Sequence, residues 1–304
     1  RDSSTSRGLG DVYKRQINAV GTPDKPIVMT SEKEEPGAWG GIHICGRAHT
    51  NAEGGKGSSE IGGAVYGGND DADNSGTLQY IRLEYTGFAF DEEHEANGIS
   101  FYGVGNGTIV DHCQAYKGSD DGFEFFGGSV NVSNLVAVSC SDDSFDWTEG
   151  WNGKGTNLVA YQEDKSTLGY DCDCLMECDN NGSNNAATPV AHPVLKNLIL
   201  VGNGGSKQGI RLRAGTEVEI DNAKVCGKGQ PLTVETALTE NALKNGTSKL
   251  TNITLTSELS SKEGIYTHAD FIAVTSNKVD ANLSYSSFED IRKECSWMNG
   301  SWVK

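Results

Sequence analysis

Residues 120–138 read DDGFEFFGGSVNVSNLVAV, and 22 residues further on residues 142–160 read DDSFDWTEGWNGKGTNLVA. Both stretches begin with paired aspartates and continue into a short run in which apolar and acidic residues alternate. Both end on an Asn that is followed by apolar residues. A pattern repeated at a step of 20 to 50 residues is the sequence signature of a repeat architecture. The fold therefore depends on whether these two runs recur elsewhere in the chain.

Both runs recur along most of the sequence. The Asn-led run begins at Asn134, Asn157, Asn197, Asn222 and Asn252, with Tyr80 and His112 in place of Asn in two earlier copies. The second run begins at Gly98, Gly122, Ser144, Leu175 and Gly209. The longer steps contain polar insertions such as residues 179–189, which are typical of loops. Two interleaved series of short strands predict an all-β fold, a β-solenoid of about 8 coils of roughly 22–25 residues with loop insertions.

The alternation within each run predicts which side chains face the interior. Successive side chains of a strand point to opposite faces, so equivalent residues of stacked coils form columns. The Asn residues would form a ladder of side-chain amides at a turn, with His112 in a hydrogen-bonding role. Gly would allow the sharp bends between strands, because a positive φ is unstrained only for Gly. The predicted inner columns contain Phe123, Phe125, Phe145, Trp147, Met176, Cys178, Ile210 and Leu212.

Composition excludes several classes of protein. The chain has 304 residues, of which 39 are Gly, with 42 acidic against 25 basic residues and a net charge of -17. Gly shows no period of three, which excludes collagen, and no apolar stretch reaches the roughly 18 residues that a membrane span needs. The excess of acid argues against nucleic acid as a partner, since phosphate binding needs clustered Lys and Arg.

Residues 1–16 differ in character from the rest of the chain. They show no hydrophobic period, and their second half, DVYKRQ, matches the translation of a sequencing-library adaptor, so we interpret them as an artefact in a metagenomic fragment. Without their two acids and four bases the chain carries 40 acids and 21 bases, a net charge of -19. Residues 17–304 are then expected to form one β-helix domain whose N-terminal cap and first coils are missing.

Several motifs resemble a known family. PIVMTS from Pro26, PGAWGGIHICGRA from Pro36, GTLQYIRLEYTGFAF from Gly76 and the two stretches quoted first are similar to bacterial secreted or lipid-anchored right-handed parallel β-helix proteins. The resemblance extends from Gly21 to about Gly205, and WMNGSWVK near the end resembles the closing segment of that group, so residues 286–304 are expected to cap the stack. It implies export to the outer cell surface and a lipid anchor upstream, but no established activity.

The outward-facing columns are acidic. Ser100, Glu124, Asp146, Glu177, Arg211 and Thr233 fall in one column, and stacked strands lie about 4.8 Å apart. Like charges about 5 Å apart repel by roughly 0.8 kcal/mol even in water, so protonation, solvent or a cation must offset them. Arg211 and Arg213 can pair with Glu177 and Asp179. Calcium prefers several carboxylate oxygens, and we expect it at the preceding turn residues, Asp120, Asp121, Asp142, Asp143 and Asp173.

The same carboxylates also permit an enzyme. Acids one coil apart match the roughly 5 to 5.5 Å separation in retaining glycosidases, so Glu124, Asp146 and Glu177 are the candidate catalytic residues of a glycoside hydrolase. A basic residue beside a calcium-binding acid cluster would suit a polysaccharide lyase. Trp151 and Tyr170 flank the strip and can stack on sugar rings, although exposed aromatic side chains more often pack against turns.

The eight Cys residues point to structure rather than to chemistry. Cys113 and Cys178 fall in inner columns as small buried hydrophobic residues. Cys140 and Cys172 lie in successive coils and can form a disulfide in an oxidising compartment, while eight Cys residues allow 105 pairings in total. Zinc is disfavoured because Cys172, Cys174 and Cys178 have no second ligand pair at suitable spacing.

These observations favour a non-enzymatic role. We expect an extracellular or surface-anchored β-helix that binds polysaccharide, or adheres to it, with calcium as a cofactor. The predicted ligand-binding residues are Glu124, Asp146, Trp151, Tyr170, Glu177, Arg211 and Arg213. The alternatives are a polysaccharide lyase or glycoside hydrolase that uses the same carboxylates, and an adhesin stalk without a small ligand.

Overall fold

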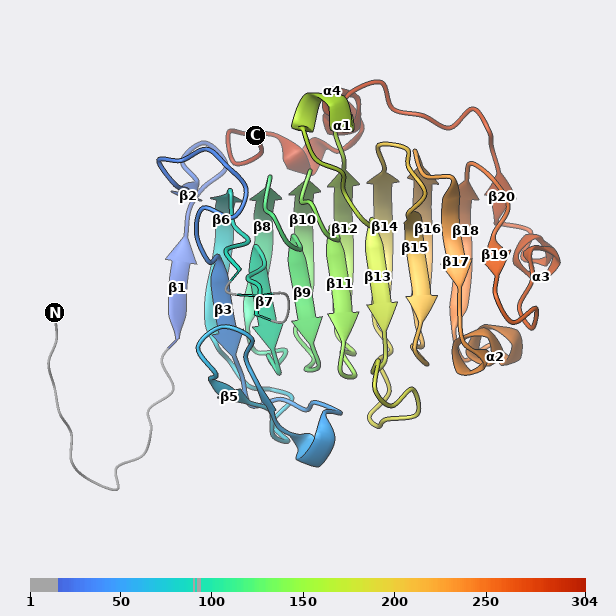
Figure 1. The fold of residues 1–304 in the computed structure, drawn as a ribbon, viewed down its shortest axis with the longest axis horizontal. Coiled ribbons are helices and arrows are strands. Elements are labelled where there is room, and N and C mark those ends of the chain that lie inside the picture. The colour runs from blue at the N-terminus through green and yellow to red at the C-terminus, as the bar shows by residue number, and fades with distance from the viewer. Residues whose placement is uncertain (1–15, 90, 92–93) are drawn as a thin grey trace, which may run out of the picture.

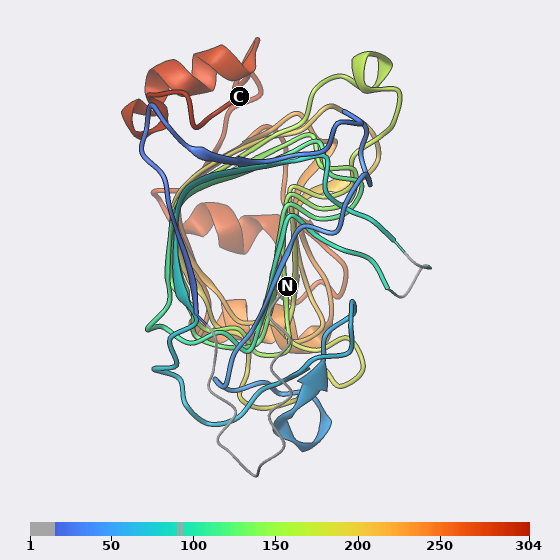
Figure 2. The same cartoon turned by 90° about the vertical axis from the view of Figure 1, so that its left-hand side faces the viewer.

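The computed structural model describes residues 16–89, 91 and 94–304, and these fold into a right-handed parallel β-helix (Figure 1). The predicted solenoid is confirmed. The stretch interpreted as adaptor sequence lies, apart from Gln16, outside the described residues. Viewed along its axis, the stack of coils encloses one interior (Figure 2).

Within the described residues, the coils form two parallel sheets and one small hairpin. The ten-stranded sheet contains β1 (Ile17–Val20), β2 (Ile27–Met29), β6 (Gly76–Glu84), β8 (Ile109–Tyr116), β10 (Val132–Val138), β12 (Lys154–Tyr161), β14 (Val194–Val201), β16 (Glu219–Cys226), β18 (Lys249–Leu255) and β20 (Lys278–Val279). The eight-stranded sheet contains β3 (Ile42–Cys45), β7 (Ile99–Tyr102), β9 (Phe123–Phe126), β11 (Phe145–Thr148), β13 (Met176–Asp179), β15 (Gln208–Arg213), β17 (Gln230–Val234) and β19 (Ser260–Ser261). The antiparallel hairpin pairs β4 (Gly57–Ser58) with β5 (Val65–Tyr66).

The helical segments all lie outside these sheets. They are α1 (Lys165–Leu168), α2 (Ala237–Asn245), α3 (His268–Ala273), α4 (Phe288–Glu294) and the short 3₁₀ turns η1 (Glu53–Gly55) and η2 (Ser296–Met298). Of the helices that the structure describes, none combines the length and the apolar character needed to cross a membrane.

The interior is filled by the predicted apolar columns. Phe123 and Trp147 are almost completely buried and belong to the main core cluster, as do the equivalent residues of neighbouring coils. The aromatic rings stack from coil to coil, with ring centres 5.0 Å apart for Phe101 and Phe125 and 5.5 Å apart for Phe123 and Phe145. Cys113 and Cys178 are fully buried in the same core, as predicted. The core is thus continuous along the axis.

The Asn ladder forms at a bend inside the strands of the ten-stranded sheet. Each ladder residue has a positive φ, from 55° at Asn134 to 65° at Asn222, so the chain turns there without leaving the sheet. The Asn157 amide donates to Asn134 Oδ1 over 2.8 Å, and the Asn197 amide donates to Asn157 Oδ1 over 3.0 Å. Asn tolerates this left-handed conformation better than most residues because its side chain can bond locally.

His112 takes the place of Asn in one coil of this ladder. It has a φ of 52°, and its Nδ1 lies 2.8 Å from a carboxylate oxygen of Asp111. Its ring also stacks on Tyr80, with the ring centres 4.4 Å apart. The predicted hydrogen-bonding role of His112 is therefore confirmed.

The C-terminal segment does not cap the stack as expected. After β20 the chain runs back along the outside of the ten-stranded sheet (Figure 1), where Ile291 and Trp302 are buried against Val136. The segment is amphipathic, and it covers apolar side chains that this sheet presents outward. The end of the stack is covered instead by α3, whose Phe271 is fully buried in the main core.

We predict that Asn157→Ala lowers the free energy of unfolding by about 2–3 kcal/mol, since it removes two ladder hydrogen bonds and places a Cβ without a polar side chain at positive φ. Asn157→Gly removes the same hydrogen bonds without the backbone strain, so its loss should be smaller by about 1 kcal/mol. Urea unfolding followed by circular dichroism measures both variants. Equal stability of Asn157→Ala and the wild type would contradict a stabilising ladder.

Candidate functional site

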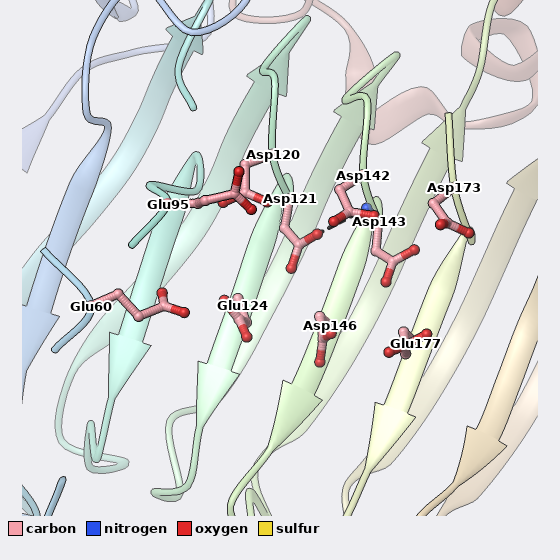
Figure 3. Close-up of a pocket in the computed structure, with 10 residues that line it drawn as sticks. All are labelled: Glu60, Glu95, Asp120, Asp121, Glu124, Asp142, Asp143, Asp146, Asp173 and Glu177. Atoms are coloured by element: carbon pink, nitrogen blue, oxygen red, sulfur yellow. Dashed lines mark hydrogen bonds between the residues drawn. The ribbon is translucent and has the colours of Figure 1, made fainter. Parts of the chain in front are cut away.

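A cavity of about 340 Å³ on the outer face of the eight-stranded sheet is lined entirely by carboxylates (Figure 3). We call it the acidic cleft. Its position follows from the strand alternation, which turns the apolar side chains inward and leaves acidic side chains on the outside. The lining residues are Glu60, Glu95, Asp120, Asp121, Glu124, Asp142, Asp143, Asp146, Asp173 and Glu177.

The floor of the acidic cleft is the predicted acidic column. Glu124 of β9 pairs in register with Asp146 of β11, which pairs with Glu177 of β13. Ser100 precedes this column and Arg211 follows it, as the sequence predicted. These three carboxylates lie on consecutive coils, with no basic side chain between them. Neighbouring parallel strands are about 4.8 Å apart, so the three carboxylates are close together.

The five turn aspartates predicted to bind metal form the second row of the cleft. Two of them also join successive coils: the Asp143 N–H donates to Asp121 Oδ1 over 2.8 Å, and the Cys174 N–H donates to Asp143 Oδ1 over 2.6 Å. Asp121 and Asp143 are 6% and 5% exposed, so backbone donors hold them in place inside the protein. Each carboxylate keeps a second oxygen for other contacts.

Two lining residues come from outside the repeated strands and were not predicted. Glu60 is contributed by the β4–β5 hairpin and Glu95 by the loop before β7. The Tyr102 hydroxyl donates to Glu60 over 3.0 Å, and the Asn97 amide donates to Glu124 over 2.6 Å. Glu60 and Glu95 lie outside the repeats, so the spacing of the repeats gives no indication that they reach the cleft. Asn97, in contrast, stands directly before the repeated run at Gly98.

Burial and mutual repulsion raise the pKa values of several carboxyl groups in the cleft. Burial, with the charges of Glu95 and Asp142, raises the pKa of Asp120 to about 7. Burial and the charge of Glu95 likewise raise the pKa of Glu60 to about 7, against the hydrogen bond from Tyr102. The pKa values of Glu124 and Asp146 are also raised, first by burial and then by the neighbouring carboxylate in the column. The cleft therefore holds protons, or another positive charge, near neutral pH.

The predicted ion pairs of Arg211 and Arg213 form at one end of the acidic column. Arg211 lies 2.9 Å from Glu177 and Arg213 lies 2.7 Å from Asp179, and Arg213 also contacts Glu177. Arg211 bonds to Glu235 as well. None of these arginines lines the cleft, so they neutralise its edge and leave the centre acidic.

Both predicted aromatic platforms are engaged elsewhere. Trp151 is 1% exposed and stacks on Phe125, with the ring centres 4.1 Å apart, so the prediction that it contacts a ligand is wrong. Its position directly after the acidic strand predicts an exposed side chain, whereas the Trp151 side chain packs into the main core. The Tyr170 hydroxyl donates to the Ser139 carbonyl over 2.7 Å, and the residue does not line the cleft.

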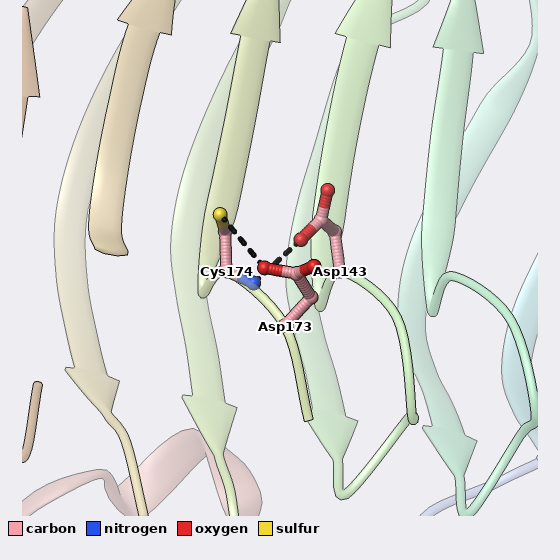
Figure 4. A group of neighbouring side chains, drawn as sticks. All are labelled: Asp143, Asp173 and Cys174. Carbon is pink, nitrogen blue, oxygen red and sulfur yellow. Dashed lines mark hydrogen bonds between the residues drawn. The ribbon is translucent and has the colours of Figure 1, made fainter. Parts of the chain in front are cut away.

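The eight cysteines are all free thiols, including Cys140 and Cys172, whose pairing the sequence left open. Burial raises the pKa of both thiols to about 12, which disfavours the thiolate that disulfide exchange requires. Cys174 differs from the others because its sulfur lies beside the cleft, 3.4 Å from Asp173 (Figure 4). Its thiol is also buried, and burial raises its pKa.

A sequence model described as a pectate-lyase like beta helix domain matches residues 12–303. The chain belongs to this family. A search of curated proteins and a search of solved structures each found no match. Membership of the pectate-lyase-like family agrees with the observed fold and indicates a role related to polysaccharides.

The cleft of this family member has the donor chemistry of a calcium site. Three groups of three carboxylates each place one oxygen per residue within 4.8 Å of one another: Asp120, Asp121 and Asp142; Asp121, Glu124 and Asp146; and Asp143, Asp146 and Glu177. All these donors are oxygens, as calcium prefers. A fourth group, Asp143, Asp173 and Cys174, includes a protonated thiol, which is a poor calcium ligand (Figure 4).

We predict that, in the presence of a chelator, the protein is more stable near about pH 5 than near about pH 8. Glu60 and Asp120 titrate at about 7 in the folded protein, so the folded state binds more protons than the unfolded state between about pH 4 and pH 7. The stability that protonation of Glu60 and Asp120 provides is fully present below that pH window and is lost as the pH rises through about 7. Thermal melting across the pH range should show a fall of several degrees.

The double variant Glu60→Gln with Asp120→Asn removes two of these titrating groups and should flatten the pH dependence. A melting temperature that rises from about pH 5 to about pH 8 in the wild type would contradict the raised pKa values.

Proposed function

We propose that this protein binds polysaccharide through the acidic cleft, with calcium held by the cleft carboxylates, and that it does so outside the cell. The observation that carries the proposal is the lining of ten carboxylates with no basic residue among them. Such a surface repels an acidic polysaccharide and needs added positive charge before it can bind one. The polysaccharide-related role of the family supplies the class of ligand, and the resemblance to secreted β-helix proteins supplies the location.

The three all-carboxylate groups are the residues that would hold calcium. Asp121 and Asp146 each belong to two of these groups, so the sites overlap along the cleft. A bound calcium ion retains coordination positions for hydroxyl or carboxylate oxygens of a sugar, and it offsets the repulsion between stacked acids. Backbone donors hold Asp121 and Asp143 in place, which reduces the ordering needed when an ion binds.

The basic residues near the cleft favour binding over lyase chemistry. A lyase needs a base to remove a proton from the sugar. Arg211 and Arg213 are each held by two carboxylates, and Lys207 is ion-paired with Asp173. These cations already have partners, so they are poorly placed to act on a substrate.

A glycoside hydrolase remains the second candidate, because one specific observation favours it. Glu124 and Asp146 are neighbours in register, and both have raised pKa values. A carboxyl group that stays protonated near neutral pH is what a general acid in glycoside hydrolysis requires.

We predict that Glu124→Gln with Asp146→Asn, which removes ligands from two of the three all-carboxylate groups, weakens calcium binding and weakens polysaccharide binding by at least about tenfold, a loss of roughly 1.4 kcal/mol. Isothermal titration with calcium chloride, followed by binding to immobilised polygalacturonate, measures both effects. Glu258→Gln, which removes an exposed acid outside the cleft, is the matched control. Unchanged calcium binding in the double variant would refute the two groups that contain Glu124 and Asp146 as the site.

We further predict that incubation with a panel of plant and host polysaccharides, with calcium present, releases neither reducing ends nor unsaturated ends. Reducing-sugar assays and ultraviolet absorbance detect the two products. Appearance of reducing ends that is lost in Glu124→Gln would establish the hydrolase instead, and appearance of unsaturated ends would establish a lyase.

A further inference from the structure

A second cavity lies on a different face of the molecule from the acidic cleft. It has a volume of about 200 Å³ and is formed between the outer face of the ten-stranded sheet and the C-terminal segment. We call it the ladder groove, because three members of the Asn ladder, Asn157, Asn197 and Asn222, line one side of it. Trp297 of η2 lines the opposite side.

The amides in the ladder groove retain hydrogen-bonding capacity. Each of these three amides donates one hydrogen bond to the Asn of the preceding coil, and that of Asn222 donates to Asn197 Oδ1 over 2.9 Å. An Asn amide nitrogen carries two N–H donors, so one donor per residue is left for a ligand. Asn197 and Asn222 are exposed to solvent, and stacking of the coils repeats this donor about every 4.8 Å along the groove.

The apolar parts of the ladder groove lie beside these amides. Val159 and Ile199 form part of its floor and are 1% and 8% exposed. Trp297 is partly buried against Trp302, with the ring centres 6.2 Å apart, which holds the indole at the edge of the groove. A row of amides facing an aromatic ring suits a ligand that has both hydroxyl groups and apolar C–H faces.

The charges in the ladder groove select against an ionic ligand. Its two charged lining residues, Lys224 and Glu294, form an ion pair with each other, and the Tyr285 hydroxyl donates to Glu294 over 2.8 Å. The lining therefore has no net charge, in contrast to the acidic cleft. Its volume is below the roughly 300 Å³ at which pockets for drug-sized ligands begin, so it fits a single ring rather than a large ligand.

We propose that the ladder groove binds one neutral sugar ring, which stacks on Trp297 and hydrogen-bonds to the amides of Asn197 and Asn222. The choice of a sugar among neutral polar ligands rests on the polysaccharide-related role of the family. Binding here requires no cation, so the groove and the acidic cleft are independent sites on one molecule. A glycan with neutral and acidic parts would engage both.

The test uses the whole protein in buffer with a calcium chelator, and the methyl glycosides of glucose, galactose, mannose and xylose as probes. Saturation-transfer NMR and the change in tryptophan fluorescence measure binding at millimolar concentrations. We expect at least one probe to bind the wild type, and Trp297→Ala to abolish that binding.

A matched pair of ladder variants tests the site without relying on Trp297. Asn222 and Asn252 both have a positive φ, of 65° and 56°, both donate a side-chain hydrogen bond to a neighbouring coil, and both are exposed, but only Asn222 lines the groove. Asn222→Gly should weaken binding by about threefold to tenfold, the value of one lost hydrogen bond, whereas Asn252→Gly should bind as the wild type does.

Three outcomes would overturn the proposal. The first is that the folded wild type binds none of the four probes, and the second is that Asn222→Gly binds them as tightly as the wild type. The third is that Glu124→Gln with Asp146→Asn loses the sugar signal, because the probes would then occupy the acidic cleft. Because the chelator removes any contribution of calcium, failure of the proposed cleft function leaves this result unaffected.

Discussion

In-register stacking of parallel coils is the constraint on which every other feature depends. It places each side chain about 4.8 Å from its equivalent in the next coil, so like residues meet like residues. For apolar side chains this gives a continuous core of stacked rings such as Phe101 and Phe125. For Asn it gives a row in which the amides of Asn157, Asn197 and Asn222 each donate to the Asn of the preceding coil. For acidic residues the same geometry brings equal charges together, and the fold has to accommodate the repulsion.

The acidic column is accommodated differently along its length. At the end near β15, Arg211 continues the column with opposite charge, Arg213 stands beside it in register with Asp179, and the result is a network of ion pairs. In the middle, Glu124 and Asp146 have acids as neighbours, and burial raises their pKa values further. A column of stacked acids that served only for solubility would gain nothing from burial, since exposure to water would weaken the repulsion. The β4–β5 hairpin and the loop before β7 enclose the cleft and make the repulsion between its carboxylates larger. Such an unfavourable electrostatic energy is expected of a binding site, where a ligand relieves it.

Sequence alone predicted the parts of this molecule that repeat. The inner columns, the Asn ladder, the register of Glu124 with Asp146 and the pairing of Arg211 with Glu177 all follow from spacing, because a repeat fixes which residues are neighbours. Residues outside the repeat could not be placed in this way. Glu60 and Glu95 reach the cleft from loops, Trp151 turns inward after β11, and the C-terminal segment packs along the side of the stack rather than across its end. Each of these depends on the path of a single loop, for which the sequence offers no second copy to compare.

The C-terminal segment changes how the solenoid holds together. In a repeat protein each unit contacts only its neighbours, so stability is nearly a sum of local terms and the ends can fray independently. Here the Ser301 N–H donates to the Pro23 carbonyl over 2.8 Å, and the Lys304 N–H donates to Gln114 over 2.8 Å. The last residues of the chain are thereby bonded to early coils, after crossing the coils between them. This strap links coils that are distant in the stack, so that detaching a terminal coil also disturbs the centre, and the array gains the cooperativity of a globular domain.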